Sequence, residues 1–216
     1  MTLRVAIMQP YFFPYAGYFR LMAASDLFVV LDDVQFPRRG RVHRCEVAAG
    51  RWLTLPLARA PRSVAINRLN WAPDAPRQLE RRLERAGIVR DAIPPPLRDH
   101  LFGTLPPVLD FLENGLKIVT RMLGLPVHFQ RSSDLSLPGD LRGQDRILAI
   151  LETLGADCYV NAPGGRSLYQ PQAFAERGIT LNFLPSYRGC HFHLLPWLLD
   201  SGAAARIRAE IDSGLT

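Results

Sequence analysis

The sequence predicts one α/β domain with a mostly parallel sheet flanked by helices, and three observations support this fold class. Short apolar runs at 5–8, 27–31 and 158–160 have the character of strands that are buried on both faces. Amphipathic segments alternate with such runs in the first and last thirds of the chain, which is the order of βαβ units. The 216 residues are 48% hydrophobic, which suffices for one good core.

The first thirty-three residues are the clearest βαβ unit. The run 5–8 must stop before Pro10, because proline cannot donate a hydrogen bond to a strand ladder. From Gly17 the apolar residues take helical spacing up to Asp26, and the second strand follows at 27–31.

The middle of the chain predicts a hairpin and then a helical insertion. Alternating apolar residues at 42–47 and 52–57 favour the hairpin, and 64–69 could add a further short strand. The segment 76–124 has helical periodicity, with proline at the expected start of its long helix. It carries no recognisable chemistry.

The last third returns to alternation of strands and helices. Strands are expected at 127–129, 158–160 and 179–183, and the final helix at 194–211. Right-handed parallel crossovers are the economical connection between them, so we expect a Rossmann-like sheet.

Charge and cysteine content narrow the function classes. The net charge is +6, and Lys117 is the sole lysine, so the surplus is arginine, which suits bidentate contacts with phosphate or carboxylate. No basic block is long enough for a nucleic-acid tail, so anionic small molecules are the expected partners. Three cysteines without CxxC spacing fit a cytoplasmic protein, and neither a membrane span nor a signal peptide is expected.

Polar residues at the ends of strands predict the site. Gln9, Asp32 and Asn161 each follow or end a strand, and parallel strands bring their carboxyl ends to one edge. We expect Asp32 or Asp33 to act as general base. The alternatives are that these carboxylates only pair with Arg39 or Arg44, and that the aromatic loop at 11–18 is a packed hydrophobic cluster.

Two loops are expected to hold the substrate. Gly164 and Gly165 allow close approach of a ligand to the backbone, and the basic loop 38–44 could bind an anion, although it could also be a solvated turn. The expected substrate-binding residues are Gln9, Tyr11, Tyr15, Tyr18, Gln35, Arg39, Arg44, Asn161, Gly164, Gly165, Arg166 and Tyr169.

Cysteine and histidine give weaker candidates. His43 and Cys45 would share a strand face, as a thiolate–imidazole pair for acyl transfer or as a half-buried cysteine beside a surface histidine. Cys158 is expected in the core, which leaves Cys45 or Cys190 as a nucleophile if transfer is covalent. Cys190, His191 and His193 lack a fourth ligand, so no metal site is predicted.

Four ordered motifs resemble a known family. They are Ile7–Phe19 (IMQPYFFPYAGYF), Asp32–Phe36, Arg131–Ser133, and Tyr159–Asn161 with Gly164-Gly165 and Leu168-Tyr169. Together they are similar to the WbqC-like family, whose usual Trp and Asn after the basic turn are Arg41 and His43 here. Tyr15–Tyr18 also falls where nucleotidylyltransferases carry His-x-Gly-His, but tyrosine cannot supply an imidazolium.

The resemblance implies a bacterial protein of surface-polysaccharide or specialised-metabolite biosynthesis. We expect it to transfer acyl or aminoacyl groups to an amino-sugar-type or specialised-metabolite acceptor. A carrier-bound substrate, with an acyl carrier protein as partner, belongs to this expectation, and no cofactor is assigned. The alternatives are a nucleotide-handling enzyme and a non-catalytic binding protein of the same pathway.

Overall fold

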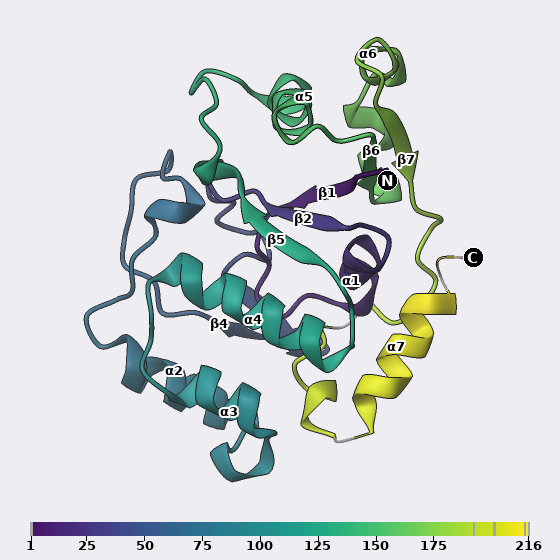
Figure 1. The fold of residues 1–216 in the computed structure, drawn as a ribbon. Helices are drawn as coiled ribbons and strands as arrows, with labels where there is room; N and C mark the ends of the chain where they lie inside the picture. The colour runs from purple at the N-terminus through teal and green to yellow at the C-terminus, as the bar shows by residue number, and fades with distance from the viewer. Residues whose placement is uncertain (1, 192, 201, 214, 216) are drawn as a thin grey trace.

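A five-stranded parallel sheet forms the centre of the described chain, which comprises residues 2–191, 193–200, 202–213 and 215 of a computed structural model (Figure 1). The strand order is β5-β2-β1-β6-β7, and every neighbouring pair is parallel. The strands are β1 (Arg4–Met8), β2 (Leu27–Val30), β5 (His128–Arg131), β6 (Cys158–Asn161) and β7 (Thr180–Phe183). The predicted α/β fold class is therefore confirmed.

Helices cover both faces of the sheet. Figure 1 shows α5 (Gly143–Leu154) and α6 (Pro171–Ala175) on one face, and α1 (Ala16–Ala23), α4 (Val108–Met122) and α7 (Ala203–Ser213) on the other. The sheet side chains alternate accordingly, because successive residues of a strand point to opposite faces. Val5 and Ile7 pack with α5, whereas Ala6 and Phe28 belong to the larger core on the other face.

The hairpin and the helical segment lie on the side of the larger core. The hairpin consists of β3 (Arg44–Ala48) and β4 (Arg51–Thr54), which pair antiparallel apart from the main sheet. Helices α2 (Ala75–Arg85) and α3 (Pro95–Phe102) precede α4, so the segment predicted as helical contains three helices. Buried Leu53, Leu79 and Leu83 connect the hairpin and α2 to the same core.

Two elements differ from the prediction. The predicted helix 194–211 is a short 3₁₀ turn at Trp197–Leu199 followed by α7, since Pro196 and Gly202 disfavour a continuous helix. The possible strand at 64–69 contains instead a 3₁₀ turn at Ile66–Arg68, next to an isolated bridge between Gln35 and Ala65. Among the described helices, none has the length and apolar character required to cross a bilayer.

Candidate functional site

The carboxyl edge of the sheet brings together polar residues that lie far apart in the sequence. β1 leads into Gln9, β2 into Asp32, β5 into Ser132, and β6 ends at Asn161. All of these strands run parallel in one sheet, so the expected convergence of Gln9, Asp32 and Asn161 at one edge is present in the structure.

A cavity of about 370 Å³ opens at this edge between β1, β6 and α5. Its lining is mainly apolar and aromatic, and it contains no charged side chain. The residues that line it are Ile7, Met8, Gln9, Tyr11, Leu31, Ile147, Tyr159, Asn161, Ala162, Gly164, Gly165, Leu168 and Tyr169. A cavity of this kind with a few polar groups is typical of small-molecule sites.

Asn161 is the polar side chain held most firmly at the cavity. It is 5% exposed, and its Oδ1 accepts a hydrogen bond of 2.7 Å from the backbone N–H of Ala162. That bond leaves Nδ2 as a donor for a ligand. A Cβ on Gly165 would lie 2.6 Å from Nδ2, so glycine at this position makes room for the amide. A Cβ on Gly164, in contrast, meets no atom within 4 Å.

Tyrosines fix the shape of the cavity. The hydroxyls of Tyr159 and Tyr169 lie 3.2 Å apart, and burial raises the pKa of Tyr159 well above its usual value. Tyr18 donates a hydrogen bond of 2.7 Å to the carbonyl of Gln9, and its ring contacts that of Tyr11. Tyr18 is buried, so it positions the loop that contains Gln9 and does not contact a ligand itself.

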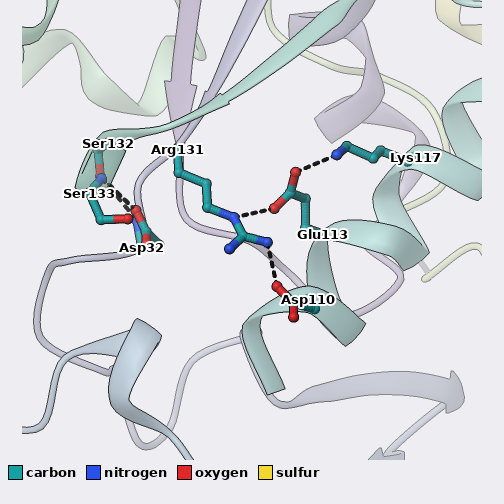
Figure 2. Close-up of polar contacts among 7 residues, drawn as sticks. All are labelled: Asp32, Asp110, Glu113, Lys117, Arg131, Ser132 and Ser133. Carbon is teal, nitrogen blue, oxygen red and sulfur yellow. Dashed lines mark hydrogen bonds and ion pairs between the residues drawn. The ribbon is translucent and has the colours of Figure 1, made fainter. Parts of the chain in front are cut away.

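The two expected carboxylates differ in exposure. Asp32 is completely buried, and its Oδ1 accepts hydrogen bonds from the N–H of Ser133 and the hydroxyl of Ser132, both at 3.0 Å (Figure 2). Asp33 is partly exposed, pairs with Arg146 of α5, and lies 2.7 Å from the same Ser132 hydroxyl. A hydroxyl has one hydrogen to donate, so Ser132 serves one carboxylate at a time.

Neither Arg39 nor Arg44 pairs with these carboxylates among the described ion pairs. The partner is Arg146, which comes from the same turn of α5 as the cavity residue Ile147. The ion pair thus places the Asp33 carboxylate next to α5, where the residue after Arg146, Ile147, lines the cavity.

A charged network holds the end of β5 against α4. Arg131 lies 2.5 Å from both Asp110 and Glu113, and Glu113 also pairs with Lys117 at 2.5 Å (Figure 2). Glu113 is 5% exposed, so this carboxylate requires its two cationic partners. Because Arg131 immediately precedes Ser132, the network also fixes the serine that binds Asp32 and Asp33.

The basic loop forms a cleft of its own, of about 620 Å³. Gln35, Arg38, Arg39 and Arg62 line it together with Phe36 and Pro37. Arg38 donates to the carbonyl of Ala60, and Gln35 donates to that of Arg62 at 2.8 Å. Arg39 and Arg62 have no carboxylate partner among the described residues, so this cleft is the part of the loop that suits an anion.

Arg44 does not share this cleft. Its guanidinium donates to the carbonyls of Arg39 and Gly40 and lies 4.4 Å above the ring of Trp52. Arg44 therefore holds the loop in place. Arg38 and Arg62, which line the cleft, are better placed than Arg44 for the expected contact with an anion.

The expected pair of His43 and Cys45 is not accessible. Cys45 is completely buried, and burial raises the pKa of its thiol. Burial and the nearby charge of Arg44 lower the pKa of His43 to about 4, and the imidazole contacts the ring of Phe36. An inert buried thiol is not a nucleophile, so the structure argues against Cys45 in catalysis. Cys158, expected in the core, is instead half-buried.

Tyr15 and Arg166 also lie away from the cavity. Tyr15 forms an isolated bridge with His193 and packs against the rings of Tyr187 and His191. Arg166 lies over the ring of Phe183. Within the described residues, no group of three or more His, Cys, Asp and Glu side chains is arranged to hold a metal ion.

Sequence reasoning missed Ser132, Arg146 and Ile147 as site residues. Ser132 lies in the motif Arg131–Ser133, whose position directly after a strand could have identified it. Arg146 and Ile147 had no such signal, since they belong to an ordinary amphipathic helix.

Comparisons with known proteins identify the family of this chain. The model of the WbqC-like protein family matches residues 9–193, a range that contains Gln9, the carboxylates and the glycine turn. This chain belongs to the WbqC-like family. A curated relative, "Uncharacterized protein Rv1507c" of Mycobacterium tuberculosis, is 25% identical over 197 residues, which cover 83% of this chain and 81% of the relative. No solved structure matches.

Most of the candidate site of this WbqC-like protein lies within the residues that the family model matches. The match ends at His193, so α7 lies beyond it, whereas all the cavity residues except Ile7 and Met8 lie inside it.

Proposed function

We propose that this WbqC-like protein transfers an acyl or aminoacyl group to the amine of an amino-sugar-type or specialised-metabolite acceptor. The observation that carries the proposal is an uncharged cavity bordered by α5, together with a partly exposed carboxylate, Asp33, that pairs with the same helix. The cavity binds a neutral group, because an ion would find no opposite charge there. Asn161 and Gln9 offer amide groups that can orient a carbonyl or a hydroxyl.

Asp33 is the general base in this proposal. The acceptor nitrogen attacks the carbonyl carbon, a C–N bond forms, and the bond to the leaving group breaks as that group takes the electron pair. The nitrogen gives its proton to Asp33. Asp32 is completely buried and therefore supports the end of β2 instead. A positioned carboxylate contributes roughly 10²–10⁴-fold to such a step.

The arginine-lined cleft of Arg38, Arg39 and Arg62 binds the anionic part of the substrate. This part is a phosphate or a carboxylate of the donor or of its carrier, and an acyl carrier protein is one such carrier. Direct transfer needs no cysteine, in agreement with the burial of Cys45. The three cysteines are free, which supports a cytoplasmic reaction.

Thermal-shift measurements with nucleotide sugars, aminoacyl donors and carrier-bound acyl groups test the proposal. A ligand at about 100 times its Kd stabilises the protein by about 2.7 kcal/mol. The variant for comparison is Gly165→Ala, whose added methyl would lie 2.6 Å from Asn161 Nδ2 and would therefore disturb the cavity. A donor that shifts the wild type and not the variant supports the proposal.

The other outcomes separate the alternatives. A shift that only nucleotides produce would favour a nucleotide-handling enzyme, although the start of α1, where such enzymes bind phosphate, is covered by Tyr187 next to Gly17. No shift with any donor, combined with a shift from a partner protein, would favour a non-catalytic binding protein.

A further inference from the structure

A second concave surface lies far from the cavity, on the other face of the sheet. It is a groove of about 400 Å³ between the hairpin and α2, lined by Val47, Arg51, Trp52, Thr54, Arg82, Arg85 and Ala86. The hairpin and α2 pack in the larger core, whereas the cavity residues Ile7, Ile147 and Tyr159 pack in the smaller one. We call the surface the hairpin groove.

The arginines of the hairpin groove lack acidic partners. Arg82 donates to the carbonyl of Thr54 at 2.7 Å and to Gln78 at 3.0 Å, and Arg51 lies 3.4 Å from the carbonyl of Arg85. Among the described ion pairs none includes Arg51, Arg82 or Arg85. A guanidinium has five N–H donors, so each keeps several for a partner.

The positive charges around Arg82 lie close enough together to affect its pKa. Burial lowers the pKa of this guanidinium, and the neighbouring charges of Arg81 and Arg85 lower it further. An anion in the groove would relieve this repulsion.

Trp52 adds an apolar surface to the charge. It is 38% exposed, and the guanidinium of Arg44 lies over its ring. Tryptophan and arginine are the residues that most often dominate the energy of protein interfaces. An exposed tryptophan among arginines that lack acidic partners is therefore typical of a surface that binds another protein.

From these contacts we infer that the hairpin groove docks a protein partner that presents a cluster of carboxylates. The outer side of α2 also carries the exposed Glu80 and Glu84, between the arginines in sequence. These carboxylates would repel a continuous phosphate backbone, whereas separate side chains of a protein can avoid them. A second copy of this chain is disfavoured, because its net charge is +6 as well.

Binding of a fluorescein-labelled oligoglutamate peptide, followed by fluorescence anisotropy, tests the inference. Arg51→Glu/Arg85→Glu reverses two exposed groove charges and should weaken binding about tenfold or more, given the strength of charged hydrogen bonds. The matched control is Arg77→Glu/Arg121→Glu, which makes the same change in net charge at exposed arginines outside the groove. It should keep the peptide affinity within about twofold, because distant surface charges are screened.

Trp52→Ala provides a second variant that leaves all charges in place and should also weaken binding. It decides the matter if the charge-reversed variant does not fold. Equal loss in the groove variant and its control, or no binding to wild type, would overturn the inference. Tighter binding of an oligouridylate through the same arginines would overturn it as well, and would assign the groove to nucleic acid.

Discussion

Two adjacent aspartates have different surroundings, and this difference matters most at the scale of single residues. Asp32 is completely buried and accepts hydrogen bonds from Ser132 and Ser133 at its Oδ1 alone, whereas Asp33 is partly exposed in its ion pair with Arg146. Because Asp32 is completely buried and Asp33 is partly exposed, Asp33 is the better placed of the two to reach a substrate.

Substitution by asparagine should separate the two roles. Asp33→Asn should lower turnover by roughly 10²–10⁴-fold if it removes the general base. In Asp32→Asn an NH₂ group replaces one carboxylate oxygen. If this group takes the place of Oδ1, its N–H groups face the N–H of Ser133, so the substitution should lower the free energy of unfolding by about 1–3 kcal/mol. Urea unfolding and initial rates with the donor found by thermal shift measure both effects.

Ser133→Ala is the matched control for these substitutions. Ser133 binds Asp32 through its backbone N–H, and its side chain is exposed. Stability and turnover should therefore stay near the wild-type values. Near-wild-type turnover of Asp33→Asn would refute its role as base.

At the scale of elements, the turn after β6 is a 3₁₀ turn, Pro163–Leu168, that supplies one wall of the cavity. Its two glycines have unequal surroundings, since Gly165 faces the Asn161 amide and Gly164 faces open space. The same substitution, glycine to alanine, therefore meets the Asn161 amide at position 165 and open space at position 164.

Gly165→Ala should displace the Asn161 side chain and abolish the thermal shift produced by the ligand of the cavity. The new methyl would lie 2.6 Å from Asn161 Nδ2, which is closer than real contacts allow. Gly164→Ala should retain most of the shift. Equal shifts in the two variants would show that Asn161 does not contact the ligand.

The strands that consist of continuous apolar residues could be predicted from the sequence. The runs at 5–8, 27–31 and 158–160 became β1, β2 and β6 within a residue or two, because strands buried on both faces need continuous apolar sequence. The end of the chain was harder. Its apolar residues fit one long helix, but Gly202 separates a 3₁₀ turn from α7.

The site could be predicted only in part, for a similar reason. Strand ends are visible in sequence, so Gln9, Asp32 and Asn161 were located at one edge. The partner of Asp33 could not be predicted in this way. Arg146 comes from α5, and the hydrophobic pattern of the sequence does not show at which angle this helix packs on the sheet. Nor does alternation alone show that Cys45 lies on the face of the hairpin that meets the core.

At the scale of the whole molecule, three histidines are held neutral between packed elements. Burial lowers the pKa values of His43, His100 and His193 to about 4. His100 packs against the ring of Phe111, and His193 accepts a hydrogen bond from the backbone N–H of Glu46. A pKa below the ordinary 6.5 means that the unfolded chain binds protons first.

With respect to these histidines, the free energy of unfolding should therefore have its full value above pH 6.5 and should fall as the pH decreases toward about 4. Urea midpoints across this window measure the slope. His100→Leu should reduce the slope, because one of the three groups no longer titrates. His128→Gln, at an exposed position, should leave it unchanged. An identical slope for His100→Leu would contradict the assignment.

The order of the strands also determines when the protein can complete its fold. β1 lies between β2, which follows closely in the chain, and β6, which pairs Cys158 with Arg4. During synthesis, one side of β1 therefore remains an unpaired edge until more than two thirds of the chain has emerged from the ribosome. Such pairing over long sequence separation is slow, and exposed edges are prone to aggregation. The wall of the cavity that β6 provides thus forms late, and the cavity is incomplete until β6 and the turn after it, up to Tyr169, have been made.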